Sequence, residues 1–246
     1  MKNKLLKTAA VTVFWIALWQ IVSMAVNESL IIVSPWDTLV RMWELSHESS
    51  FYKALGTSFL NIGTGFILAA VLGTALAILS RGVKIVYELL SPLFAVIKAT
   101  PVASFTLILF FWGIKGKNLS VWISLIMVLP VIFFALYEGI GAADVKLLEM
   151  AKVYKVPKTR QIRDIYLPAA LPSVTSALSV AIGFAWKSGV AAEVIAIASG
   201  SIGGLLYDAK TLLESKDVFA ISATVIIISK LSEWLIVKLL LPREVR

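Results

Sequence analysis

Long apolar runs separated by short polar segments dominate the chain. A helix needs about 20 mostly apolar residues to cross roughly 30 Å of hydrocarbon. Six segments meet this requirement, and they cover approximately residues 8–26, 58–79, 89–114, 119–139, 170–197 and 218–241. None of the polar segments between them is long enough to form a soluble domain. The pattern predicts an all-α membrane protein with a single transmembrane domain over residues 1–246.

The composition agrees with this prediction. Hydrophobic residues make up 59% of the 246 residues, charged residues only 15%, and the mean hydropathy is +0.89. An average globular chain has about 45–50% apolar and about 25% charged residues. A soluble fold of this length could not bury so much apolar side chain, so lipid is the expected surrounding.

The first apolar run could also be mistaken for a secretory signal, since Lys2, Lys4 and Lys7 precede it and Ser23 to Ala25 resemble a cleavage site. The run is longer than the roughly 7–15 apolar residues of a signal peptide. We therefore expect a retained first span.

The distribution of Lys and Arg predicts the orientation. The chain has 23 of these residues, and its net charge of +8 would also suit a nucleic-acid-binding protein. If the N-terminus is cytoplasmic, fourteen of these residues fall in cytoplasmic segments, six in outer segments and three within spans. Cytoplasmic loops of membrane proteins carry such an excess of Lys and Arg. The sequence thus predicts that both termini and the loop 142–166 are cytoplasmic.

Two further patterns concern helix packing. Ser34-Pro35-Trp36-Asp37, between the first two spans, is typical of a turn or a helix start. Small residues recur every fourth position in the second span, where a helix could approach closely from the same subunit or from a second copy. They are Asn61, Gly65, Ala69, Gly73 and Ala77.

Charged residues also occur inside the predicted spans. Lys98, Lys187 and Glu193 lie where a charge costs at least about 2.5–3.5 kcal/mol on insertion scales. They could form structural charge pairs between spans or line a passage, and the sequence leaves both open. Lys230 and Glu233 are three residues apart, so they could pair on one helix face or reach the cytoplasmic interface, and we interpret them as structural.

Two segments are expected to interrupt regular helix. Pro101, close to Lys98, should break the third span. After the fifth span, three glycines within Ser199 to Gly204 predict irregular backbone at the outer face, either as a gate or as a tight turn.

Catalytic chemistry is hard to place on this chain. It has no cysteine and one histidine, His47, so thiolate or histidine metal clusters and a Ser-His-Asp set are not expected. The phosphate-binding pattern Gly-x(4)-Gly-Lys-Ser/Thr is also missing. We expect no catalytic, cofactor or metal site, which disfavours a membrane-embedded enzyme. A stand-alone secondary transporter remains an alternative, although its usual inverted repeats are not evident.

The loop after the fourth span carries the most specific pattern. Glu149-Met150-Ala151-Lys152-Val153-Tyr154-Lys155 is followed, nine residues later, by Ile165-Tyr166-Leu167-Pro168. This resembles the EAA motif of permeases in binding-protein-dependent ABC importers. Met150 replaces the second motif residue and Lys155 the usual glycine, so Pro157 could supply the bend instead.

Two other stretches resemble the nitrate/sulfonate/taurine group of these permeases. The first is Lys98-Ala99-Thr100-Pro101 followed by Phe110-Phe111-Trp112-Gly113, with Lys98 in place of an arginine. The second runs from Ala185-Trp186 through Val190-Ala191-Ala192-Glu193 to Ala198-Ser199-Gly200-Ser201-Ile202-Gly203.

The resemblance implies a short helix over residues 145–154 that docks on an ATPase and transmits its closure. The implied coupling residues are Glu149, Met150, Ala151, Tyr154, Lys155, Ile165, Leu167 and Pro168. For the passage or gate, the candidates are Lys98, Pro101, Trp186, Lys187, Glu193, Ser201 and Gly203.

The implied partners are two copies of an ATP-binding subunit that carries ATP and Mg, an extracytoplasmic binding protein, and a second permease copy in a bacterial inner membrane. The expected solute is a small anion such as a sulfonate, taurine or nitrate, with a pyrimidine precursor of thiamine as the alternative. Lys98 and Lys187 favour an anion, while Glu193 offsets them.

Overall fold

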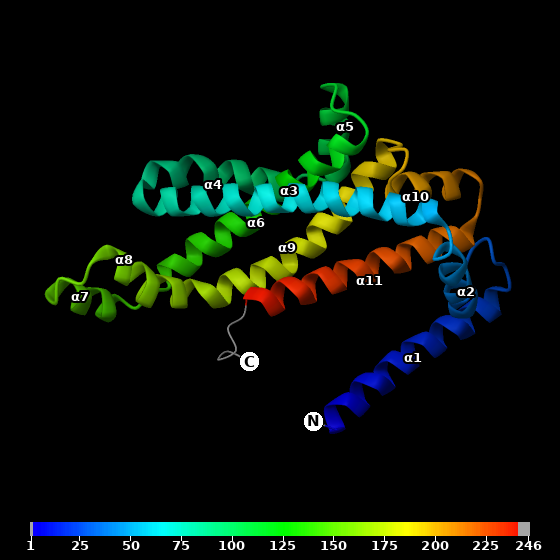
Figure 1. Cartoon of the computed structure of the whole chain (residues 1–246), viewed down its shortest axis with the longest axis horizontal. Helices are drawn as coiled ribbons and strands as arrows, with labels where there is room; N and C mark the ends of the chain where they lie inside the picture. The colour runs from blue at the N-terminus through cyan, green and yellow to red at the C-terminus, as the bar shows by residue number, and fades with distance from the viewer. Residues whose placement is uncertain (1, 241–246) are drawn as a thin grey trace.

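The computed structural model describes residues 2–240, and these residues form an all-α bundle, as predicted (Figure 1). Residue 241 of the last predicted span, and the basic residues Arg243 and Arg246, lie outside the described residues. The elements are α1 (Lys2–Val26), α2 (Pro35–Leu45), α3 (Ser49–Gly82), α4 (Lys84–Ala99), α5 (Val102–Phe111), α6 (Lys117–Gly141), α7 (Val145–Val153), α8 (Lys158–Gln161), the π-helical turn η1 (Ile162–Tyr166), α9 (Leu167–Ile195), α10 (Ile202–Thr211) and α11 (Ser215–Leu240).

Five helical segments within this range are long and apolar enough to cross a membrane. They are α1, α3, α6, α11 and the continuous run Lys158–Ile195, which joins α8, η1 and α9. A sixth crossing results if the bent pair α4 and α5 is counted as one span.

The third predicted span, 89–114, is not one straight helix. It is bent by 103° between α4 and α5, and α5 projects away from the direction of α4 (Figure 1). Thr100 has extended backbone angles, because the ring of Pro101 disfavours the helical conformation in the preceding residue. Pro101 therefore ends one helix and begins the next.

Helices α3, α6 and α9 form the centre of the bundle, with α3 and α9 each packed along α6. At Gly65 of α3, an added methyl group would lie 2.8 Å from Cβ of Ser124 on α6. At Gly73, it would lie 3.1 Å from Cβ of Ile132. The row of small residues therefore brings α3 close to α6 of the same subunit.

A wide turn connects α8 to α9 without breaking the helix. The N–H of Leu167 donates to the carbonyl of Ile162, five residues earlier, which makes this turn π-helical. Pro168 follows immediately in the first turn of α9 and has no N–H to donate, so the hydrogen bond from this position to the preceding turn is missing.

The short helix α2 begins at the predicted signal, where the backbone N–H of Asp37 donates to Oγ of Ser34 at 3.0 Å. Ion pairs from Arg41 to Asp217 and from Lys216 to Asp37, the latter 3.2 Å, tie α2 to the start of α11. Asp217 raises the pKa of the Arg41 guanidinium, which therefore stays charged.

Helix α1 is joined to the segment before α2 by hydrogen bonds near its C-terminal end. Nε1 of Trp19 donates to the carbonyl of Val33 at 3.0 Å, and Oγ of Ser23 donates to the carbonyl of Ile32 at 3.2 Å. The rest of α1 diverges from the bundle, and its apolar side chains from Leu6 to Leu18 are exposed (Figure 1).

Candidate functional site

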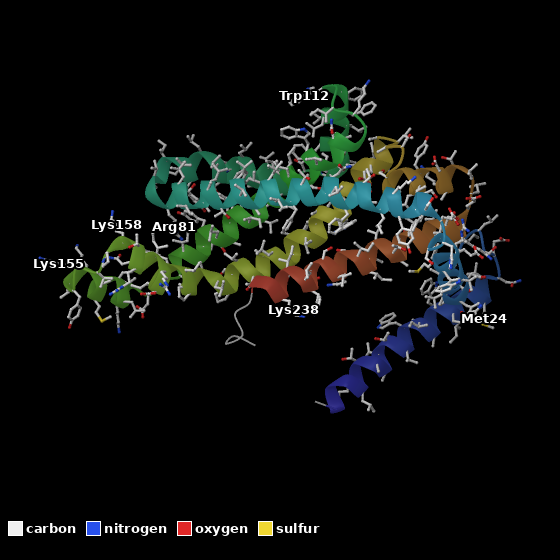
Figure 2. The ribbon with its side chains drawn as sticks, in the orientation of Figure 1. Met24, Arg81, Trp112, Lys155, Lys158 and Lys238 are labelled. Atoms are coloured by element: carbon white, nitrogen blue, oxygen red, sulfur yellow. The ribbon has the colours of Figure 1, made fainter. Side chains whose placement is uncertain are left out.

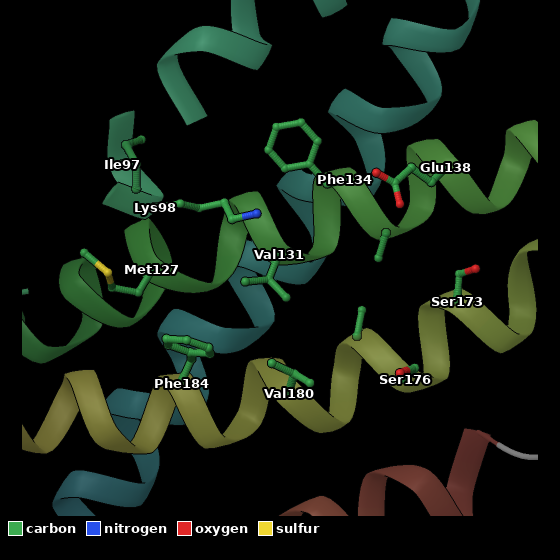
Figure 3. Close-up of a pocket in the computed structure, with 12 residues that line it drawn as sticks. Ile97, Lys98, Met127, Val131, Phe134, Glu138, Ser173, Ser176, Val180 and Phe184 are labelled. Atoms are coloured by element: carbon green, nitrogen blue, oxygen red, sulfur yellow. The ribbon is translucent and has the colours of Figure 1, made fainter. Parts of the chain in front are cut away.

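A cavity of about 540 Å³ lies between the end of α4, α6 and α9 (Figure 3). Lys98 enters it from α4, and its Nζ lies 5.2 Å from the ring centroid of Phe134 on α6. Glu138 lines the same cavity from α6, and Ser173 and Ser176 line it from α9. Apart from these groups, the lining is apolar, which is typical of cavities that accept small molecules.

A second cavity of about 390 Å³ lies between α9, α10 and α11. Lys187 and Lys230 line it, and Nζ of Lys230 lies 2.6 Å from a carboxylate oxygen of Glu233, so these two side chains pair on α11. Lys98 and Lys187 therefore line different cavities. Trp186 borders the second cavity but is only 3% exposed, with its ring 6.0 Å from that of Phe59.

Of the two possibilities left open for the intramembrane charges, pairing between Lys98 or Lys187 and a carboxylate is not found in the described residues. Within residues 2–240, neither Lys98 nor Lys187 has a carboxylate within 4.0 Å. Glu193 is fully buried instead, and its partners are neutral donors. The three charges thus have three separate environments.

Glu193 anchors the N-terminus of α10. One of its carboxylate oxygens accepts from Oγ of Ser58 on α3 at 2.6 Å and from the backbone N–H of Gly203 at 3.1 Å. Oγ of Ser58 in turn accepts from the N–H of Ile202 at 2.9 Å. Ser201 caps the same helix end by accepting from the N–H of Gly204 at 3.0 Å.

This network corrects the expectation of irregular backbone over Ser199 to Gly204. Helix α10 already begins at Ile202, and only the short segment before it is irregular. Gly203 is in the first turn because a side chain would collide with α9: an added methyl group would lie 2.7 Å from the backbone nitrogen of Val194. The sequence showed three glycines but not that α9 packs against one of them, Gly203.

Ser58 is the member of this network that the sequence analysis missed. It lies on the buried face of α3, four residues after Ala54 and on the side that continues toward Gly65. That extension of the small-residue row is the signal that could have identified it. Glu138 was missed because it stands at the edge of the predicted span 119–139, where a carboxylate looks like a solvated helix end.

The predicted loop helix is present as α7. Its N-terminus is capped by Asp144, whose side chain accepts from the N–H of Lys146 at 2.8 Å. At its C-terminus, Lys155 has a φ of 49°, the left-handed conformation that glycine adopts most readily. The N–H of Val156 then donates to the carbonyl of Ala151 at 2.8 Å. Lys155 therefore ends α7 in a backbone conformation that a glycine at this position would adopt without strain.

Helix α7 presents apolar side chains that nothing in residues 2–240 covers. Val153 is 77% exposed, Tyr154 76% and Met150 52%, whereas Ala151 is 3% exposed and packs inward. Glu149 and Lys155 are exposed beside them. Figure 2 shows Lys155, Lys158 and Arg81 at the same end of the molecule, with Met24 toward the opposite end.

The second half of the motif, from Ile165 to Pro168, lies at the start of α9 and not on α7. Ile165 is half-buried in the π-helical turn, while Leu167 and Pro168 are exposed in the first turn of α9. Pro101 is exposed at the bend between α4 and α5. In the part of the chain that the structure describes, no group of three His, Cys, Asp or Glu side chains is arranged to hold a metal ion.

Comparisons with known proteins agree with the fold. An aliphatic sulfonates transport permease of Bacillus subtilis (strain 168) is 28% identical over 220 residues, which are 89% of this chain and 79% of that protein. A nitrate import permease of Synechocystis sp. is 26% identical over 84% of this chain and 77% of its own length. A formylaminopyrimidine transport permease of Halalkalibacterium halodurans is 24% identical over 89% and 87%.

Among solved structures, an inward-facing structure of the MetNI methionine ABC transporter contains a chain with the same fold. The TM-score is 0.56 at 16% sequence identity, over 82% of this chain and 98% of that chain. Residues 65–243, which include the cavity helices α6 and α9 and the whole of α7, match the family described as binding-protein-dependent transport system inner membrane component. The chain belongs to this family of multi-pass inner-membrane permeases of ABC importers.

Proposed function

We propose that the chain forms the translocation path of an ATP-driven importer and that α7 is the helix through which a separate ATPase moves it. The observation that carries this proposal is the position of α7 between the two helices that line the larger cavity. Only residues 142–144 separate α6 from α7. Only residues 154–157 separate α7 from the continuous helical run of α8, η1 and α9. Such short connections would transmit a displacement of α7 directly to both cavity walls.

The exposed surface of α7 supports a protein partner at this end. Three large side chains, Met150, Val153 and Tyr154, lie among the charged groups Glu149 and Lys155. A short helix with this mixture fits a groove on another protein. The partner is an ATP-binding subunit on the cytoplasmic side, present in two copies, each docking on one permease of a homodimer. A binding protein delivers the solute to the opposite face.

The proposed solute is small and carries an anionic group. The relatives include permeases named for sulfonates, nitrate and a formylaminopyrimidine. Two of these three solutes are anions. Lys98 supports the same choice, because its ammonium group lines the cavity without a carboxylate partner among the described residues, and an unpaired cation in an apolar cavity attracts an anion.

Purification of the chain with its partners tests the proposal. A tag on this chain, gentle detergent extraction and mass spectrometry should recover an ATPase with a phosphate-binding loop in equal amount. Reconstituted with that ATPase and the binding protein, the permease should take up solute only with ATP. Recovery of the chain alone, active in uptake without ATP, would instead support the stand-alone secondary transporter.

The role of α7 is tested by Glu149→Lys. Reversing this exposed charge should weaken ATPase docking and abolish ATP-dependent uptake while the protein stays folded in the membrane, because Glu149 contributes no hydrogen bond within residues 2–240. The matched control is Glu88→Lys, another exposed carboxylate, which pairs only with Lys84 on α4. Equal uptake and equal ATPase recovery in the two variants would contradict the assignment.

A further inference from the structure

The cavity between α4, α6 and α9 contains charges of both signs. Lys98 supplies an ammonium group and Glu138 a carboxylate, and the sequence analysis had identified only the first (Figure 3). Both charged groups can be located relative to Phe134 on α6. The Lys98 Nζ lies 5.2 Å from the Phe134 ring centroid, and Glu138 follows Phe134 by four residues on the same face of α6.

The ammonium group of Lys98 thus lies over a residue that is one helical turn of α6 before Glu138. One turn of an α-helix advances by about 5.4 Å. Lys98 and Glu138 do not reach each other: within the described part of the chain, no pair of opposite charges at 4.0 Å or less includes either of them. The ring of Phe134 holds the ammonium group on its face, which leaves the N–H donors of Lys98 available to a solute.

The cationic side chain of Arg81, at the C-terminal end of α3, is already engaged. Nε of Arg81 donates to the backbone carbonyl of Tyr137 at 2.7 Å, and its guanidinium lies 3.9 Å from the centroid of the Tyr137 ring. Arg81 thus closes the C-terminal end of α6 and does not pair with Glu138. The carboxylate of Glu138 remains free to bind a cationic group.

The rest of the cavity is suited to a short, partly apolar solute. Val131, Val180 and Phe184 form apolar walls, and Ser173 and Ser176 line the cavity from α9 (Figure 3). The volume of about 540 Å³ is within the range of about 300–1,000 Å³ for small-molecule sites.

We propose that this cavity accepts a small zwitterion, whose anionic group binds Lys98 and whose cationic group binds Glu138. Both side chains are exposed to the cavity, and a solute with one charge would pair with only one of them. A zwitterion can pair with both. The inference rests on the proposed function and narrows its anionic solute to one that also carries a cationic group.

The first test identifies the solute. The binding protein that stimulates ATP hydrolysis by the purified complex is denatured, and the solute it releases is characterised by mass spectrometry and NMR. We expect an anionic group and a protonated amine or quaternary ammonium in one small molecule. A solute with only one kind of charge, or with none, would overturn the inference.

The second test measures ATP-dependent uptake of that solute by the complete importer in proteoliposomes. Glu138→Gln and Lys98→Gln should each raise the KM for uptake by about tenfold or more, the effect of losing about 1.4 kcal/mol of binding. The control Glu88→Gln removes an exposed carboxylate from α4 that does not line the cavity, and its KM should not change. An unchanged KM in both cavity variants would refute the proposal.

The double variant separates binding of the solute from mutual pairing of the two side chains. If both charges bind the solute, Lys98→Gln combined with Glu138→Gln should transport worse than either single variant. Recovery of uptake in the double variant would mean that the two side chains serve each other at some stage of transport, which contradicts the inference. ATP-dependent uptake of a singly charged solute would contradict the zwitterion inference but not the proposed function. Uptake without ATP would contradict both.

Discussion

At the residue scale, the most informative group is the buried carboxylate of Glu193. The sequence indicated an unusual charge in the fifth span, but it could not show whether the charge lines a passage or supports a helix. The answer depends on Ser58, which is 135 residues away along the chain and donates to Glu193 at 2.6 Å. The carboxylate therefore takes the place of a missing partner for the first N–H groups of α10.

Removal of this carboxylate should destabilise the protein. Glu193→Ala leaves the hydroxyl of Ser58 and the N–H of Gly203 buried without their acceptor, and each such group costs about 1–3 kcal/mol. Glu193→Gln keeps an acceptor oxygen and should lose much less. Thermal unfolding in detergent should show a clearly lower Tm for the alanine variant than for the glutamine variant. Equal values of Tm would show that the hydrogen bonds to Glu193 are not what holds α10.

At the element scale, the lengths of the apolar runs predicted five of the long helices with approximate limits, because each must satisfy its own backbone within lipid. The third predicted span is instead a pair of helices with a bend between them. Local chemistry also predicted the start of α2 at Ser34 and the break at Pro101. The angle of that break, 103°, depends on how α5 packs against α6 and α9 and has no local signal. Lys155 is a similar case, since its left-handed turn follows from how the chain returns from α7 toward α8.

The small residues of α3 show which part of a packing surface a sequence can reveal. Their spacing predicted a closely packed face, but a period does not say which helix covers it. The structure places α6 of the same chain there, with Gly65 against Ser124. Gly63, two residues earlier, has no atom within 4 Å of the position of an added methyl group. These two glycines therefore differ in packing while sharing the same helix.

This difference gives a matched pair of variants. Gly65→Ala should lower the free energy of unfolding by about 1–3 kcal/mol, since the new methyl group meets backbone and Cβ atoms of α6 that cannot move independently. Gly63→Ala should leave stability unchanged or raise it by up to about 1 kcal/mol, because alanine favours helix. Tm values measured in the same detergent compare the two. A Gly65→Ala protein as stable as Gly63→Ala would mean that α3 and α6 are not in close contact.

At the scale of the whole molecule, the two ends of the bundle are chemically different. One end carries α7, α8 and a dense group of basic residues, and the other carries α2, the first turn of α11 and the ion pair between Arg41 and Asp217 (Figure 2). The surplus of Lys and Arg predicts that the α7 end is cytoplasmic. This topology also requires that α4 and α5 together cross the membrane, because five crossings would place the two termini on opposite sides.

Because the chain has no cysteine, single cysteines introduced at exposed positions can report this topology directly. Three positions are suitable for Glu28→Cys, Lys115→Cys and Lys158→Cys. Glu28 lies just after α1, Lys115 lies between α5 and α6, and Lys158 is the first residue of α8, which follows α7. In intact cells whose outer barrier admits small reagents, a membrane-impermeant maleimide should label Glu28→Cys and Lys115→Cys, and it should label Lys158→Cys only after the inner membrane is opened. Protection of Lys115→Cys together with labelling of Glu28→Cys would show that α4 and α5 turn back within the membrane. Labelling of Lys158→Cys in intact cells would place α7 outside, where no ATPase can reach it, and would refute its proposed role in coupling.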